Sequence, residues 1–149
     1  MSIATLILGQ SGTGKSTSLR NLNPNEVLLI QVVKKPLPFR SAEWKYLSKD
    51  GGSIYVTDSP EVIIKRMQQT SKPIIIIDDY QYVMANEYMR RSTETGFNKF
   101  TEIGRKTWDV FTEASNLADN KRVYILSHTE EAESGKTKIK TIGKMLDEK

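Results

Sequence analysis

The sequence contains no cysteine and only one histidine, His128. The lack of cysteine excludes disulfides and thiolate metal sites, and it is typical of proteins from a reducing compartment. A single histidine also leaves no basis for a zinc site built on several histidines. These absences direct attention away from redox and zinc chemistry.

Long apolar runs are also missing. Every run is far shorter than the about 20 residues that a membrane-spanning helix requires. Met1 and Ser2 lead directly into the first apolar run, so we expect no signal or transit peptide. The sequence therefore predicts a soluble, cytoplasmic protein with no membrane partner.

A chain of 149 residues favours one compact domain over residues 1–149, with a core that is stable without cross-links. The formal net charge is +4. This charge is compatible with a nucleic-acid partner, but many proteins that bind no nucleic acid share it. Charge alone therefore decides little about function.

Short runs rich in β-branched apolar residues predict the strands. Continuous apolarity is typical of strands buried on both faces, as in a parallel sheet covered by helices. The runs are Ile3–Leu8, Val27–Val33, Pro73–Ile77 and Arg122–Leu126, with Ser53–Thr57 as a weaker fifth.

Three stretches between these runs predict helices. Residues 14–21 follow the first run, and Ser59 as N-cap with Pro60 at the first helical position begins a second helix that ends near Gln69. Residues 98–117 predict the longest helix, and together with Phe97 they carry one apolar stripe at helical spacing, whose aromatic side chains we expect in the core. Alternating strands and helices predict an α/β fold, a mostly parallel sheet flanked by helices.

Residues 9–16 read Gly-Gln-Ser-Gly-Thr-Gly-Lys-Ser and match the phosphate-binding pattern G-x-x-x-x-G-K-[ST]. Glycines let successive backbone N–H groups surround a phosphate. Lys15 supplies a positive charge for the β- and γ-phosphates, and the Ser16 hydroxyl is a hard oxygen ligand for Mg²⁺. The alternative is a Gly/Ser-rich turn that matches by chance. The residues predicted to bind the nucleotide are Gln10, Ser11, Gly12, Thr13, Gly14, Lys15, Ser16 and Thr17.

Two carboxylates, Asp78 and Asp79, end the apolar run at residues 73–77. A phosphate loop requires a carboxylate at the end of a neighbouring strand to hold the Mg²⁺ shell. We assign this role to Asp78, and we expect Asp79 to orient or deprotonate the attacking water. The alternative is that an aspartate at a strand end caps the following turn.

The run at residues 122–126 is followed by Ser127 and His128. In open α/β sheets, ligands bind at the carboxyl ends of the strands. Either side chain is therefore a candidate sensor of the γ-phosphate, and His128 joins Lys15 and Asp79 as a predicted catalytic residue. A structural or solvated histidine is the alternative, and the sequence leaves both interpretations open.

The segments GQSGTGKST, PIIIIDDY and RVYILSHTEE together resemble the RecA-like branch of P-loop ATPases. More closely, the chain is similar to small ATP-binding proteins of bacteriophages, some of which are RecA-like single-strand annealing proteins. The resemblance implies ATP and Mg²⁺ as cofactors, and a polar sensor at His128. The second strand lacks the glutamate that RecA-like enzymes usually carry at its end, so either Asp79 replaces it or hydrolysis is slow. Relatives also continue beyond the last motif, whereas this chain stops at Lys149, so we expect a truncated chain or a minimal core.

Two basic segments are candidates for binding single-stranded DNA. Arg90 and Arg91 lie in a polar stretch after the paired aspartates, and arginine binds phosphate and stacks on bases. Lys136, Lys138 and Lys140 share one face if their segment is a strand. A nucleic-acid phosphate backbone could lie along that face. The alternative is a solvated edge strand whose lysines prevent aggregation, which gives the same pattern.

The leading hypothesis is an ATP-dependent protein that acts on single-stranded DNA in recombination or annealing, as a homo-oligomeric ring or filament. A small nucleoside or nucleotide kinase is one alternative, although the sequence has no Arg-rich lid. The other is a nucleotide-gated module of a phage replication or packaging complex that does not hydrolyse its ligand.

Overall fold

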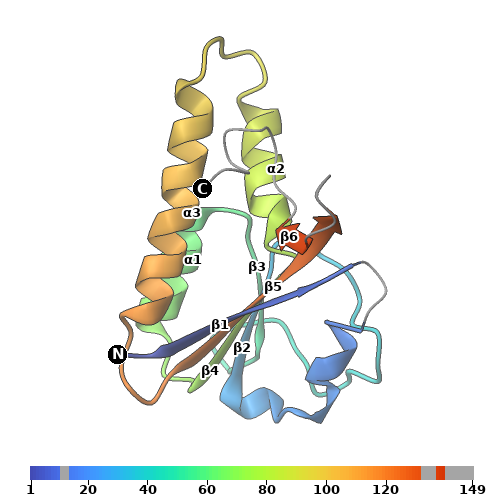
Figure 1. Ribbon diagram of the computed structural model, residues 1–149. Helices are drawn as coiled ribbons and strands as arrows, with labels where there is room; N and C mark the ends of the chain where they lie inside the picture. The colour runs from blue at the N-terminus through green and yellow to red at the C-terminus, as the bar shows by residue number, and fades with distance from the viewer. Residues whose placement is uncertain (11–13, 132–136, 140–149) are drawn as a thin grey trace.

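The computed structural model describes residues 1–10, 14–131 and 137–139. It is an α/β fold in which five parallel strands form one sheet in the order β1-β5-β4-β2-β3 (Figure 1). The strands are β1 (Ile3–Gly9), β2 (Val27–Gln31), β3 (Ile54–Val56), β4 (Ile74–Asp78) and β5 (Arg122–Glu131), and β6 (Thr137–Ile139) pairs antiparallel with the end of β5. The predicted α/β class, the parallel sheet and all five predicted strands are confirmed.

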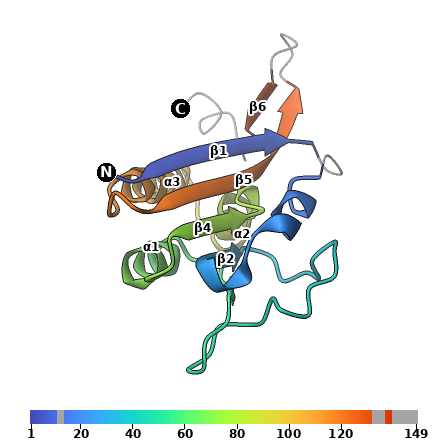
Figure 2. The same cartoon turned by 90° about the horizontal axis from the view of Figure 1, so that it is seen from below.

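Three α-helices cover one face of the sheet: α1 (Pro60–Gln69), α2 (Gln81–Arg90) and α3 (Asn98–Ser115). The opposite face carries two 3₁₀ helices, η1 (Thr17–Asn21) and η2 (Pro24–Glu26), and the segment between β2 and β3 (Figure 2). No helix within these described ranges is both long and apolar enough to cross a membrane.

The two faces of the sheet have separate cores because alternate residues of each strand point to opposite sides. The core under the α-helices joins the sheet to α1 and α3; it includes Leu28, Ile30, Ile63, Met67, Ile75, Ile77, Val110 and Ala114. The core on the other side joins the sheet to η1 and the β2–β3 segment; it includes Leu19, Val27, Leu29, Trp44 and Ile76. The central strands β2 and β4 are therefore buried on both faces, as their apolar runs predict.

The predicted start of α1 is confirmed. The Ser59 hydroxyl accepts a hydrogen bond from the Val62 N–H at 3.4 Å, and Pro60 occupies the first helical position. In α3 the buried stripe contains Ile103, as expected, and also Val110.

Two aromatic residues expected in the core are instead exposed. Phe97 is 74% exposed and Trp108 is 69% exposed. Phe97 precedes the first residue of α3, where it lies at the end of a loop. Trp108 lies next to the buried stripe, whose position at this turn is filled by the half-buried Thr107. The expectation that the aromatic side chains of this stripe belong to the core is therefore wrong for Phe97 and for Trp108.

Two segments differ from the predicted helices. After the phosphate loop the chain forms only the short η1, not a helix that begins at residue 14. The helix α2, which the sequence analysis did not identify, begins directly after Asp79 and Tyr80 and ends with Arg90. The polar stretch predicted as a loop therefore begins inside a helix.

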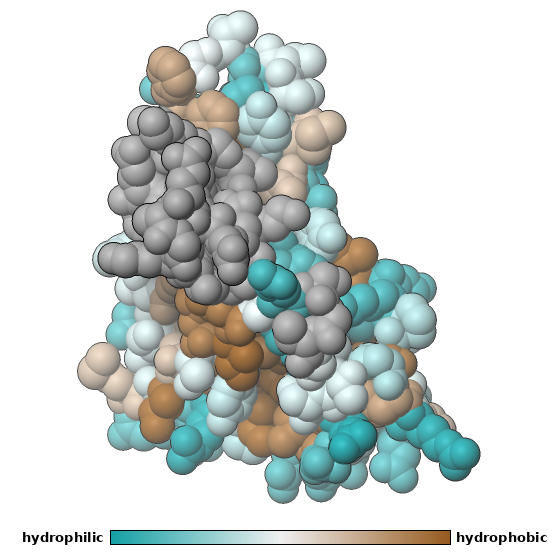
Figure 3. Space-filling view, turned by 45° about the vertical axis from the view of Figure 1, so that its right-hand side comes forward, coloured by the Kyte–Doolittle hydropathy of each residue, from teal (hydrophilic) through white to brown (hydrophobic). Residues whose placement is uncertain are grey.

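The first strand, β1, is an edge strand that is largely exposed. It pairs with β5 on one side, and no other strand of the described residues pairs with it. Ile3, Leu6 and Leu8 are 52%, 39% and 38% exposed, and apolar residues gather over the sheet on the face drawn in Figure 3. Burial of this strand on both faces was expected from its apolar run and is wrong, because an edge strand is not enclosed by neighbours.

Candidate functional site

A cavity of about 240 Å³ lies at the carboxyl ends of the parallel strands. The end of β1 lies beside β5, where Gly9 is opposite His128, and β4 lies on the other side of β5. The sequence analysis expected the two motif-bearing strands to be neighbours, but β5 separates them. The cavity is lined by residues 14–17 and by Lys35, Pro36, Pro38, Asp79 and His128.

The phosphate-loop sequence contributes Lys15 to this cavity. Its Nζ donates hydrogen bonds to the carbonyl oxygens of Gly9 at 2.7 Å and Gln10 at 2.9 Å. Burial lowers the pKa of Lys15, while the charges of Asp79 and Asp78 oppose that shift. Gly14 has φ +89°, a left-handed conformation that glycine adopts without strain. Ser11, Gly12 and Thr13, which were predicted to bind phosphate, lie outside the described residues.

Ser16 and Asp78 come together although 62 positions separate them in the sequence. The Ser16 hydroxyl donates a hydrogen bond to Asp78 Oδ2 at 2.9 Å, and Asp78 is 1% exposed. Burial raises the pKa of Asp78, and the nearby charge of Asp79 raises it further, whereas Lys35 and Ser16 act against the shift. The two residues predicted to hold Mg²⁺ are thus adjacent; the ion itself stays a prediction.

Asp79 has an unusual backbone conformation. Its φ is +59°, the left-handed region, which aspartate adopts more readily than most residues. The buried Asp79 directly follows the last residue of β4, and it begins the turn that leads into α2. Its Oδ2 lies 2.7 Å from Lys35 Nζ, and its Oδ1 lies 3.6 Å from His128 Nε2. The predicted pair of Asp79 and His128 is therefore in place around the cavity.

Lys35 is a site residue that the sequence analysis missed. Its Nζ also lies 3.6 Å from Asp78 Oδ2 and 3.4 Å from Ser16 Oγ. Burial alone would lower the pKa of Lys35, but the hydrogen bond to Asp79 and the charges of both aspartates raise it overall. Lys35 lies four positions after Gln31, the last residue of β2, and the sequence carries no local signal that brings it to the aspartates at the end of β4.

Gln31 and Gln81 are further residues that the sequence analysis did not identify. Gln31 ends β2, and its Nε2 donates a hydrogen bond to the backbone oxygen of Lys35 at 3.0 Å. Gln81 Oε1 accepts hydrogen bonds from Ser127 Oγ at 3.3 Å and from the His128 N–H at 3.1 Å. These two buried glutamines hold the backbones of Lys35 and His128 in place.

Among the described residues, a metal site built only from protein carboxylates and histidines is not found. No group of three or more His, Cys, Asp or Glu side chains in the described part of the chain has the arrangement to hold a metal. Mg²⁺ does not require one, because it usually binds one or two protein oxygens together with waters and substrate phosphates. Ser16 and Asp78 satisfy that smaller requirement.

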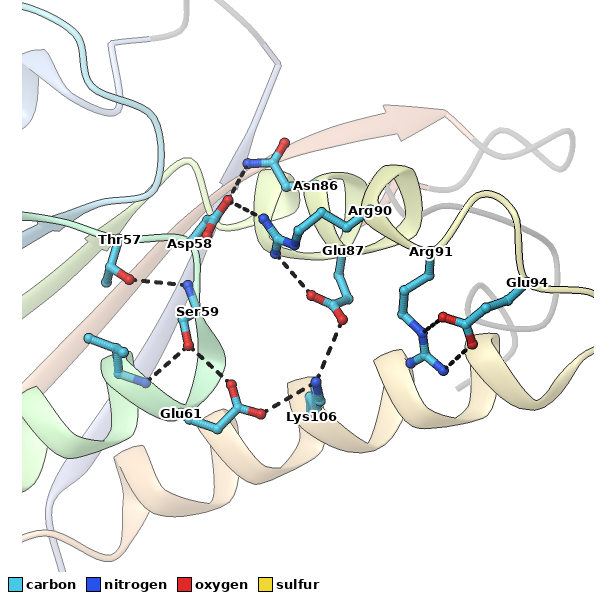
Figure 4. Close-up of polar contacts among 11 residues, drawn as sticks. Thr57, Asp58, Ser59, Glu61, Asn86, Glu87, Arg90, Arg91, Glu94 and Lys106 are labelled. Atoms are coloured by element: carbon cyan, nitrogen blue, oxygen red, sulfur yellow. Dashed lines mark hydrogen bonds and ion pairs between the residues drawn. The ribbon is translucent and has the colours of Figure 1, made fainter.

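The two arginines predicted to contact DNA form ion pairs within the protein. Arg90 lies between Asp58 and Glu87, at 2.8 and 2.9 Å (Figure 4). Arg91 contacts Glu94 and Glu102, both at 2.7 Å. We call this group the helix cluster; it consists of Asp58, Glu61, Glu87, Arg90, Arg91, Glu94, Glu102 and Lys106.

The other predicted DNA surface consists of Lys136, Lys138 and Lys140. Lys136 and Lys140 lie outside the described residues. Lys138 lies in β6, in register with Glu130 of β5. The predicted strand is therefore present over residues 137–139, and the DNA contact stays a prediction.

No family model matches the chain, and no curated protein matches it. The case for a function therefore depends on the phosphate-loop sequence and on the geometry of the cavity.

Proposed function

We propose that the chain binds a Mg²⁺–nucleoside triphosphate, ATP in the first instance, in this cavity and hydrolyses it, as a RecA-like P-loop ATPase. The observation that carries the proposal is the convergence of Lys15, Ser16, Asp78, Asp79 and His128. They come from the loop after β1, from the end of β4 and from β5, and all lie at or beside one cavity. A turn that matched the phosphate pattern by chance would not account for a buried carboxylate hydrogen-bonded to its serine.

The volume of the cavity fits the phosphates better than a whole nucleotide. Sites that enclose a drug-sized ligand usually measure about 300 to 1,000 Å³, and this cavity measures about 240 Å³. We therefore assign the polyphosphate to the cavity and the base to the surface outside it. Base preference would then depend on residues that the cavity does not contain.

Each side chain has a chemical task in the proposed reaction. Lys15 binds the β- and γ-phosphate oxygens, and Ser16 with Asp78 holds Mg²⁺, which neutralises charge on the transferred phosphoryl group. Asp79 orients the attacking water or accepts its proton. His128, whose Nε2 lies 3.6 Å from Asp79 Oδ1, is placed to respond to the terminal phosphate.

The ion pair between Asp79 and Lys35 favours a second candidate function. Lys35 Nζ lies 2.7 Å from Asp79 Oδ2, so this carboxylate oxygen is already in contact with a cation and is not open to an attacking water. The end of β2 supplies Gln31 in place of a glutamate. If turnover is slow or absent, the protein is a nucleotide-gated module, in which the bound nucleotide controls the activity of a partner protein, and not an efficient hydrolase.

The proposal extends to single-stranded DNA and to a homo-oligomeric ring or filament, and this part depends on the sequence resemblance alone. The resemblance and the basic segments offer Arg90, Arg91 and the lysines near β6 as contacts, and the ion pairs of the two arginines argue against the arginine part. A DNA phosphate would have to replace carboxylates that each arginine already contacts.

The test is release of inorganic phosphate from ATP and Mg²⁺ with no nucleoside added, with and without single-stranded DNA. We expect release that DNA accelerates and that Asp79→Asn reduces, with Glu94→Gln from the helix cluster as the matched control. ATP binding without release would overturn hydrolysis in favour of the gated module. Phosphate that moves only to an added nucleoside would identify a kinase.

A further inference from the structure

The ammonium group of Lys35 lies among the oxygen atoms that the proposed function assigns to the metal site. Its Nζ is 2.7 Å from Asp79 Oδ2, 3.4 Å from Ser16 Oγ and 3.6 Å from Asp78 Oδ2. Ser16 and Asp78 are the two residues assigned to Mg²⁺. A protein cation therefore lies beside the ligands of the proposed metal cation.

The burial of the two aspartates explains why a cation is needed there. The side chains of Asp78 and Asp79 are only 1% and 7% exposed, and they are adjacent in the sequence. Two neighbouring carboxylates that are removed from water are costly to keep charged without a partner. Lys35 forms ion pairs with both of them.

We propose that Lys35 is a built-in counter-ion, which occupies the metal position in the nucleotide-free protein and moves to the terminal phosphate when the Mg²⁺–nucleotide binds. This inference rests on the proposed function, because it names a regulatory residue of the same site. Its consequence is that the protein binds Mg²⁺ weakly by itself and distinguishes a nucleoside triphosphate from a diphosphate through one lysine.

The Lys35 ammonium group and Mg²⁺ are too close to occupy the site at the same time. Mg²⁺ binds oxygen at about 2.0 to 2.1 Å, so an ion held by Ser16 and Asp78 would take up the space beside both of these oxygens. Lys35 Nζ lies within 3.6 Å of the same two atoms. An ammonium group and a divalent cation so close together also repel each other, and the lysine has to leave.

A hydrogen bond holds the backbone of Lys35, whereas its side chain is 35% exposed and has room to turn. Gln31 Nε2 donates a hydrogen bond to the Lys35 carbonyl oxygen at 3.0 Å, and Pro36 follows directly. The long lysine side chain therefore moves without the loop. It remains in the cavity lined by residues 14–17, where a terminal phosphate would be the nearest anion once Mg²⁺ neutralises the aspartates.

The first experiment titrates Mg²⁺ into the nucleotide-free protein and measures heat and thermal unfolding. Lys35→Met leaves the carboxylates without their counter-ion, so we expect Mg²⁺ to bind at least about 10-fold more tightly than to the wild type, equivalent to about 1.4 kcal/mol. Lys34→Met is the matched control, because Lys34 is exposed and its Nζ lies over the Tyr46 ring at 5.1 Å. Equal Mg²⁺ affinity in wild type and Lys35→Met would overturn the inference.

The second experiment uses the wild-type protein, so it does not depend on the folding of a variant. An amine-acylating reagent labels Lys35 and Lys34, and mass spectrometry of peptides measures both rates. We expect Mg²⁺ alone to raise the labelling of Lys35, Mg²⁺ with a non-hydrolysable ATP analogue to lower it again, and Mg²⁺ with ADP not to lower it. Labelling of Lys35 that is the same in all these states would contradict the proposed movement.

The two levels of proposal fail in different ways. If the protein binds no nucleotide but Lys35→Met still tightens Mg²⁺ binding, the proposed function is wrong and the counter-ion role stands for a metal site alone. If nucleotide binds and Lys35 responds to neither ligand, the proposed function stands and the role of Lys35 is wrong.

Discussion

Two charged clusters lie at different depths in this molecule. The first, which we call the cavity cluster, consists of Ser16, Lys35, Asp78, Asp79 and His128. The second is the helix cluster between the β3–α1 turn, α2 and α3 (Figure 4). Both contain carboxylates in contact with cations at 2.7 to 2.9 Å. Distance alone does not distinguish a binding site from a surface network.

Burial distinguishes the two. The carboxylate side chain of Asp78 is 1% exposed, whereas that of Asp58 in the helix cluster is 32% exposed. Water screens an exposed pair such as Arg90 and Asp58, so its contribution to stability is at most about 1 kcal/mol. Buried carboxylates have no such screening, and they bind an incoming cation strongly. The cavity cluster is therefore suited to bind a ligand, and the helix cluster to join helices.

The largest effect is expected from Asp78→Asn. This change removes one of the two proposed protein ligands for Mg²⁺, so binding of the Mg²⁺–nucleotide should weaken by more than about 100-fold, since even residues behind metal ligands contribute about 10- to 100-fold. Equilibrium binding with and without a chelator measures it. Glu102→Gln, in the helix cluster, is the control and should leave the affinity unchanged. Equal losses in both variants would remove the distinction between the clusters.

A second prediction concerns DNA and the helix cluster. If Arg91 is held by Glu94 and Glu102 as a structural contact, Arg91→Met leaves the salt dependence of single-stranded DNA binding unchanged. If it contacts DNA, as the sequence predicts, the slope of log affinity against log salt falls by about 1. We expect the unchanged slope, because this cluster has five carboxylates for three cations. A reduced slope in Arg91→Met would show that the helix cluster also binds DNA.

The smallest effect is expected from acid titration of the helix cluster. The hydrogen bond from Arg90 is the main cause that lowers the pKa of Asp58 below its ordinary 3.8. The folded form therefore holds this proton less tightly than the unfolded chain, and the stability it provides is present above pH 3.8 and is lost as the pH falls further.

Asp58→Asn removes this contribution. The free energy of unfolding should decrease less steeply with falling pH below about 3.8 in the variant than in the wild type, by less than about 1 kcal/mol because the pair is partly exposed. Urea unfolding at a series of pH values measures the difference. A steeper decrease in Asp58→Asn would show that Arg90 does not stabilise the charged form.

The sequence predicts where the strands and helices lie along the chain better than it predicts which strands lie side by side in the sheet. The strands β2 and β4 and the start of α1 follow from apolar runs and a serine cap, which are local signals. The order of the strands is not local, so nothing in the run Ile3–Leu8 indicates that β1 lies at an edge with exposed side chains. The helix α2 was missed because the analysis took its C-terminal residues for part of a polar loop.

The same distinction applies to the site. Lys15 and Ser16 were predicted from a motif of fixed spacing, and Asp78 was predicted from its position at the end of an apolar run. Lys35 reaches the site from the loop after β2, and Gln31 holds its backbone there. Such a contact depends on how a loop folds over the sheet edge, which residue type and spacing do not encode.

The most direct test of the central claim is a calorimetric titration of Mg²⁺–ATP into the wild type and into Lys15→Ala. The account predicts Mg²⁺-dependent binding to the wild type and loss of that binding in Lys15→Ala, with both proteins equally folded. Full affinity in Lys15→Ala, or no binding to the wild type at any Mg²⁺ concentration, would contradict a polyphosphate site in this cavity.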